Sequence, residues 1–199
     1  GYRILGLTTV LMGPAATQIL ADMGADVVKV ETADGDVIRS VMPARNSGMG
    51  AAFLNSNRGK RSIVLDLKNP DGRAAFLKLV ESADALVYSL RPGTMEGLDL
   101  GYDICRAAKP DLVYCGAYGF HEDGPYAGQP AYDDVIQSAS GMAAIQAFTT
   151  GEPRYMPSVM ADKIVGLTVV YSLSMALLHR ERTGEGQRVD VPMFETMVQ

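Results

Sequence analysis

One acidic residue lies in a setting that suits chemistry. Asp162 stands near the start of an apolar stretch with helical spacing, between Met156 and Gly166. A helix N-terminus keeps a carboxylate ionised and an apolar environment strips its water, so Asp162 is a candidate nucleophile. The alternative is an ordinary acid in a first helical turn, which the helix dipole stabilises without any chemistry. These residues alone leave both interpretations open.

A set of basic residues in the first half of the chain suggests an anionic ligand. Two of its members follow predicted strands: Lys68 comes directly after the stretch 62–67, and Arg91 lies in a Gly/Pro turn after 85–89. Phosphorylated ligands bind at such strand ends in open α/β sheets. A solvated surface is the alternative explanation. The members are Lys29, Arg39, Arg58, Lys60, Arg61, Lys68 and Arg91.

Motifs for several other chemistries are missing. His121 and His179 are the only histidines, and neither belongs to a metal-ligand motif, so we expect no metal. The sequence has no Gly-x-Ser-x-Gly elbow and no Walker loop. The first strand–helix turn, residues 8–14, has one glycine where the dinucleotide fingerprint needs three. That turn is still expected to face the ligand crevice of the sheet, where helix N–H groups suit an anion.

Strand and helix patterns alternate along the whole chain, which predicts a doubly wound, mostly parallel α/β sheet of Rossmann-like type with helices on both faces. Residues 32–59 are polar, rich in glycine and irregular. The expected strands are 3–8, 26–31, 62–67, 85–89, 112–116 and 187–191. The expected helices are 15–24, 73–82, 102–108, 135–145 and 159–179, with a last one from Pro192.

Composition narrows the partners and the compartment. The net charge of −5 offers no general attraction for nucleic acid. The most apolar run, 164–178, has 15 residues, fewer than the roughly 20 of a membrane span, and favours a buried core helix and no membrane partner. Cys105 and Cys115 suggest unpaired thiols in a reducing compartment, and no signal peptide is visible, so we expect a cytoplasmic protein.

Six segments together resemble the class III coenzyme A transferases of the CaiB/BaiF type, which include formyl-CoA transferase, carnitine-CoA transferase and α-methylacyl-CoA racemase. The resemblance spans the chain in order and implies one CoA-binding α/β large domain over 1–199, with the smaller second domain of the family beyond it. A start at Gly1 without methionine, and a helical pattern still running at Gln199, fit that expectation. The segments are GP (13–14), LADMGADVVKVE (20–31), GDVIR (35–39), NRGKRSIVLDLK (57–68), RPG (91–93) and TGEGQ (183–187).

The resemblance assigns roles residue by residue. It implies that Asp162 is the catalytic aspartate, and that three short segments contact coenzyme A. Thr32 and Gly97 stand where several members carry a phosphate-binding arginine, which leaves Arg39, Arg58 and Arg61 as candidate replacements. The implied coenzyme A contacts are Leu65, Asp66, Leu67 and Lys68 at the adenosine and phosphate end, Ser89, Leu90 and Arg91 in the next turn, and Ala131, Tyr132 and Asp133 near the thiol.

The implied activity is CoA transfer from an acyl-CoA to a small carboxylic acid. The carboxylate of Asp162 would form an aspartyl mixed anhydride and then an aspartyl-CoA thioester. A racemase on the same fold is the alternative, although racemases carry a histidine where Tyr132 stands; Tyr132 also suits a packing role. A non-catalytic CoA-binding or assembly subunit is a further alternative. The family also implies an interlocked homodimer.

Overall fold

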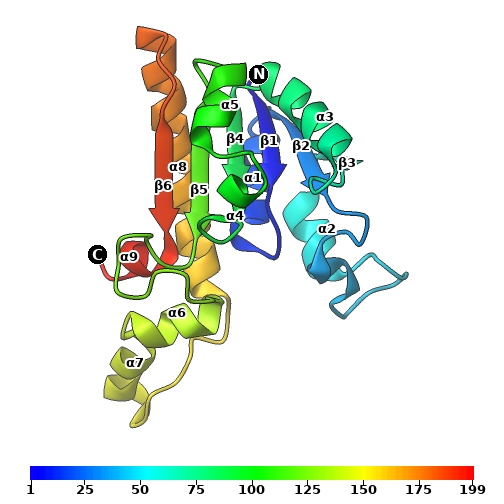
Figure 1. The fold of residues 1–199 in the computed structure, drawn as a ribbon. Helices are drawn as coiled ribbons and strands as arrows, with labels where there is room; N and C mark the ends of the chain where they lie inside the picture. Colours follow the sequence, from blue (N-terminus) through cyan, green and yellow to red (C-terminus); the bar gives the residue numbers. More distant parts are fainter.

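A single twisted sheet forms the centre of the structure, a computed structural model that describes all of residues 1–199 (Figure 1). The strands are β1 (Arg3–Leu7), β2 (Asp26–Glu31), β3 (Arg61–Val64), β4 (Ala85–Tyr88), β5 (Val113–Tyr118) and β6 (Arg188–Pro192). All neighbours pair in parallel, in the order β3-β2-β1-β4-β5-β6. The predicted doubly wound α/β class is therefore confirmed.

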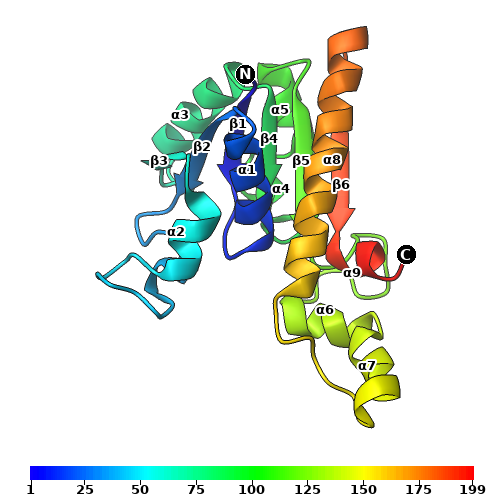
Figure 2. The same cartoon turned by 180° about the vertical axis from the view of Figure 1, so that it is seen from behind.

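Helices cover both faces of this sheet. Helices α1 and α8 lie on the face seen in Figure 2, and α3 and α5 lie on the opposite face. The α6–α7 pair extends past the carboxyl ends of the strands. The helices are α1 (Met12–Asp22), α2 (Ala51–Asn57), α3 (Pro70–Glu81), α4 (Thr94–Gly97), α5 (Tyr102–Ala108), α6 (Asp133–Ala139), α7 (Met142–Thr150), α8 (Met160–Thr183) and α9 (Met193–Met197), with a 3₁₀ turn η1 at Val37–Ser40.

Each face of the sheet has its own hydrophobic core because side chains alternate along a strand. Ile4 and Val27 belong to the core under α1 and α8, whereas their neighbours Leu5 and Val28 belong to the core under α3 and α5. Both sets are buried. The inner strands β1, β2, β4 and β5 are therefore buried on both sides, as a parallel sheet between two helical layers requires.

Several predicted boundaries were wrong for local reasons. Helix α2 and turn η1 lie in residues 32–59, which the glycine content marked as irregular. The predicted helix 135–145 is two helices, because Gly141 adopts a left-handed conformation (φ 81°) between α6 and α7. Strand β3 ends at Val64 rather than at residue 67. Helix α1 begins at Met12, since the proline in its first turn needs no N–H donor there.

Helix α8 places one side against the sheet and α1. Its buried residues include Val165, Val169 and Leu173. Gly166 permits close contact, because a Cβ there would lie 3.1 Å from the carbonyl oxygen of Met12. With 24 residues, and an 18-residue window of mean hydropathy 1.5, α8 is longer than the apolar run suggested and satisfies the length and composition of a membrane span. In this fold it is nevertheless a core helix on its sheet-facing side.

The strand order reverses between β1 and β4, and the loops after these two strands diverge there. Ligands of open α/β sheets bind in the crevice that such a divergence creates at the carboxyl ends. A ligand site is therefore expected between residues 8–11, after β1, and residues 89–93, after β4.

Candidate active site

Two adjacent cavities lie at this crevice. The larger one, here called the Asp162 pocket, has a volume of about 370 Å³, and the smaller one, the Asp36 pocket, of about 250 Å³. Thr9, Leu90 and Thr94 line both cavities, so the two share a wall and together make an elongated site across the strand ends. Volumes of this order are typical of sites for small molecules and cofactors.

The Asp162 pocket brings together segments that are far apart in the sequence. Val10 comes from the loop after β1, Ser89 from the loop after β4, and Phe120 from the loop after β5. The first two loops are joined directly, since the N–H of Thr9 donates to Oγ of Ser89 at 2.9 Å. The predicted residues that line this pocket are Asp162, Ser89, Leu90, Arg91, Ala131 and Tyr132.

Burial controls the acidity of Asp162. The residue is only 9% exposed in the first turn of α8, and its carboxylate accepts no hydrogen bond from the protein. Burial, with a smaller contribution from the charge of Asp133, raises the pKa of Asp162 to about 7. The expectation of a fully ionised carboxylate therefore changes: desolvation outweighs the helix dipole, and near pH 7 protonated and ionised forms coexist.

Asp133 supports the nucleophile candidate instead of lining a cavity. Its Oδ1 accepts the backbone N–H of Asp162 at 2.8 Å, and its Oδ2 accepts Nε2 of Gln137. Gln137 in turn donates to the carbonyl of Ser158 and accepts the N–H of Met156. The predicted coenzyme A contact of Asp133 is thus not seen in the lining, and its visible role is to fix the start of α8 against α6.

The Asp36 pocket contains most of the segment predicted for the other end of the ligand. Asp66, Leu67 and Lys68 line it, whereas Leu65 packs against the core beneath α3 and α5. Thr32 also lines it, at a position where several family members carry arginine. The cavity is therefore apolar for the most part, with a few charged side chains at defined places.

Two cations at the site are free to bind an anion. The side chains of Lys68 and Arg91 are exposed and make no ion pair or hydrogen bond. The three candidate replacements are all engaged elsewhere: Arg39 pairs with Glu31, Arg58 with Asp22 and Arg61 with Asp26, and none lines either cavity. The structure does not support a substitute role for these arginines.

Sequence patterns missed several residues of the site. The cavities also include Val10, Phe120, Met193 and the 128–130 turn, and at the other end Thr8, Lys29 and Asp36. Lys29 was singled out as basic but is buried in an ion pair with Asp36. The signal was the position of the second strand inside a parallel sheet covered on both faces, where a lysine is buried whichever face it points to and must find a partner.

The geometry is that of a doubly wound, parallel α/β sheet with a buried carboxylate at the crevice beside its strand ends. The sequence pattern of the family described as CoA-transferase family III matches residues 1–199. The chain belongs to this family. The predicted family resemblance is thereby confirmed over its whole length.

Individual relatives agree with this assignment. The chain is 43% identical to a succinyl-CoA:mesaconate CoA-transferase of Haloarcula hispanica, over 98% of this chain and 52% of the relative. A succinate–glutarate CoA-transferase of Agrobacterium fabrum is 39% identical, over 98% and 50%. The solved structure of a CAIB/BAIF family protein from Brucella suis is 36% identical, with a TM-score of 0.94 over 100% of this chain and 53% of that one. The chain spans about half the length of the curated relatives it matches.

Proposed function

We propose that the protein is an acyl-CoA:carboxylate CoA-transferase in which Asp162 is the nucleophile. One observation carries the proposal: the Asp162 carboxylate is buried, has no hydrogen-bond donor in the protein, and lines a cavity that shares a wall with a second pocket. A carboxylate held without donors is a stronger nucleophile than a hydrated one.

The residues present fit coenzyme A as the thioester substrate. The elongated site has the reactive carboxylate at one end and the unpaired Lys68 at the rim of the other. Thr8, which belongs to the lining of the Asp36 pocket, has a buried hydroxyl with no partner in the protein. A phosphorylated nucleotide with a long thiol arm matches this distribution of charge and length.

The proposed chemistry occurs on Asp162. Its carboxylate oxygen attacks the donor thioester carbonyl, the carbon–sulfur bond breaks, and Asp162 carries a mixed anhydride. Attack of the released thiolate on the aspartyl carbonyl expels the donor acid and leaves Asp162 as a CoA thioester. The acceptor carboxylate then attacks this thioester, and return of the thiolate to the acceptor carbonyl regenerates the free Asp162 carboxylate.

Trapping of the intermediate tests the proposal. The full-length protein is incubated with an acyl-CoA, hydroxylamine is added, and Asp162 is examined by mass spectrometry. We expect conversion of Asp162 to a hydroxamate only when acyl-CoA is present. No such modification in a protein that binds CoA would refute the mechanism. Because the relatives are named for succinate, mesaconate and glutarate, the donor and acceptor panel begins with short dicarboxylic acids.

Tyr132 favours transfer over racemisation. It lines the Asp162 pocket and is 65% exposed, where α-proton exchange would need a second acid–base group opposite the aspartate. A tyrosine does not supply the imidazole base that the histidine of the racemases would provide at this position. Solvent deuterium at the α-carbon of a 2-methylacyl-CoA, without CoA exchange, would support the racemase instead. Full biological activity of Asp162→Ala would indicate a non-catalytic subunit.

A homodimer is the second part of the proposal. The side of α8 that faces away from the sheet exposes a continuous apolar row, here called the α8 stripe. Its spacing of three and four residues is that of a helix-packing surface. The stripe consists of Ile164, Leu167, Tyr171, Met175 and Leu178. Light scattering on the full-length protein tests the dimer, and cell fractionation tests the expected cytoplasmic location.

A further inference from the structure

The turn after β1 contains a strained residue. Val10 has φ 66°, in the left-handed region that β-branched residues avoid, and it lines the Asp162 pocket. Asp99 is the other non-glycine residue with positive φ, and it lies outside both pockets. Backbone strain of this kind persists only where the surroundings hold it, and it concentrates at functional sites.

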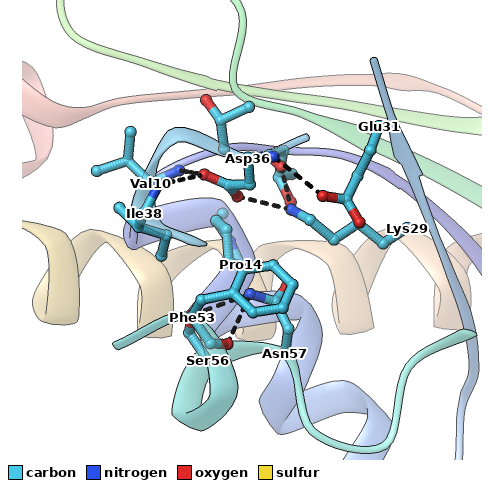
Figure 3. Close-up of polar contacts among 12 residues, drawn as sticks. Val10, Pro14, Lys29, Glu31, Asp36, Ile38, Phe53, Ser56 and Asn57 are labelled. Carbon is cyan, nitrogen blue, oxygen red and sulfur yellow. Dashed lines mark hydrogen bonds and ion pairs between the residues drawn. The ribbon is translucent and has the colours of Figure 1, made fainter. Parts of the chain in front are cut away.

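A buried ion pair holds this turn from both ends (Figure 3). Oδ1 of Asp36 accepts the N–H of Val10 at 3.2 Å, and Oδ2 accepts Nζ of Lys29 at 2.9 Å. Nζ of Lys29 also donates to the carbonyl oxygen of Thr8 at 2.6 Å. The backbone of Asp36 is fixed as well, since its N–H donates to Oε2 of Glu31 at 3.0 Å.

Stability alone does not explain this pair. The side chains of Lys29 and Asp36 are 2% and 0% exposed. Removal of two charges from water costs about as much free energy as their attraction returns, and apolar residues of similar size often stabilise a fold equally well. Apart from the N–H of Ile38, which Oδ1 of Asp36 accepts as the cap of η1, the pair contacts the Thr8 carbonyl and the Val10 N–H, which flank Thr9.

Thr9 separates the two halves of the site. It lines both the Asp162 pocket and the Asp36 pocket, and its N–H reaches across to Ser89. A shift of this turn would therefore change the wall beside the nucleophile and the wall of the other pocket together. Displacements of about 1 Å in such walls lower turnover strongly.

We infer that Lys29 and Asp36 are positioning residues that hold the Thr8–Val10 turn in its strained form and so shape the reactive end of the site. The inference rests on the proposed CoA transfer. We call the Lys29–Asp36 pair, with its contacts to this turn, the clamp. The inference predicts that removal of the clamp lowers kcat more than it raises KM for the acyl-CoA, since the wall of the Asp162 pocket depends on the turn.

The test uses paired variants of the full-length protein. Lys29→Met/Asp36→Leu removes both charges and the acceptor for Val10. Lys29→Met/Asp36→Asn removes the same charges, but its amide oxygen can still accept the Val10 N–H. We expect the first variant to lose roughly tenfold to a hundredfold in kcat and the second to lose less. Equal kcat in both variants and the wild type would overturn the inference.

Substitution of the strained residue separates positioning from a merely structural role. Glycine adopts positive φ without strain, so in a Val10→Gly background the Lys29→Met/Asp36→Leu change should cost less than about threefold in kcat, measured as a double-mutant cycle. The same cost in both backgrounds would contradict the inference. If the leucine variant does not fold, Asp36→Glu replaces it: the charge remains, the acceptor moves, and kcat should still fall.

Amide exchange keeps this test independent of the proposed function. The Val10 N–H should exchange slowly in the wild type and in Lys29→Met/Asp36→Asn, and faster in Lys29→Met/Asp36→Leu. Equal protection in all three would refute the clamp. A wild-type protein that transfers no CoA but shows this exchange pattern would refute the proposed transfer and leave the clamp standing.

Discussion

Asp162 and Asp133 form an unequal pair of carboxylates. Asp133 accepts the Asp162 N–H and lies close enough to raise the pKa of its neighbour, whereas Asp162 faces the cavity. The sequence offered Asp162 as a candidate because an acid in an apolar first turn is visible from residue order, and the family resemblance implied its catalytic role. The loss of hydration that raises its pKa depends on side chains from other elements, which residue order does not reveal.

Replacement of Asp162 should abolish activity and make the folded protein more stable. The folded-state pKa of Asp162 lies above its unfolded value of 3.8, so the ionised carboxylate destabilises the fold as the pH rises from about 4 through 7. Asp162→Asn should abolish CoA transfer and raise the free energy of unfolding at pH 8 on the order of a few kcal/mol. Urea denaturation at pH 8 and pH 3.5 measures this. The difference should shrink at pH 3.5, and an equal difference at both pH values would argue against the burial effect.

The pH dependence of turnover should report the same group. The attacking carboxylate must be ionised, so kcat/KM should rise with pH through about 7 and then level off. Asp133→Asn removes the negative charge that raises the pKa of Asp162, and the rise should move to lower pH. Asp134→Asn, at the exposed neighbouring position, is the matched control and should leave the profile in place. Identical profiles for all three proteins would exclude this electrostatic coupling.

At the scale of elements, helix α8 positions Asp162 through its contact with α1. Gly166→Val would push the new side chain toward the Met12 carbonyl, 3.1 Å from the position of its Cβ. We expect a loss of about 1–3 kcal/mol in the free energy of unfolding. Gly97→Val, in helix α4 with no atom within 4 Å of its Cβ position, is the control and should cost clearly less. Chemical denaturation compares the two, and equal losses would mean that the close contact does not matter.

The sequence predicted the helices and strands well where the hydrophobic periodicity agrees with the Gly, Pro and Asn residues that mark turns. Strands β1, β2, β4 and β5 follow mostly buried runs of residues. Helix α3 was predicted from residue 73 but begins at Pro70, directly after Asn69, whose side chain accepts the N–H of Asp71 as a helix cap. Helix α2 was missed because its neighbouring glycines resemble a loop, although Phe53 and Ser56 are buried. The Val10 turn could not be predicted, because its conformation depends on Asp36 from a distant loop.

At the scale of the whole molecule, the α8 stripe should carry the association of two chains. Leu167→Asp places a charge at a position that is 54% exposed in the chain alone and would be covered in a dimer. We expect weaker association on dilution, measured by light scattering, because an unpaired buried charge is costly. Ala74→Asp, on the exposed side of α3, makes the same kind of change away from the stripe and should leave association unchanged. Equal behaviour of the two variants would exclude the stripe as the interface.

The pairing of β5 with β6 has a consequence for synthesis of the chain. Strand β5 ends at Tyr118, but its outer partner begins at Arg188, after α6, α7 and α8. During synthesis on the ribosome, the N–H and C=O groups on the outer edge of β5 therefore remain unpaired while these helices emerge. Such an edge is a template for strand addition by another nascent chain. Any fragment that stops before β6 inherits this hazard permanently, so aggregation of truncated products is the expected failure of this fold.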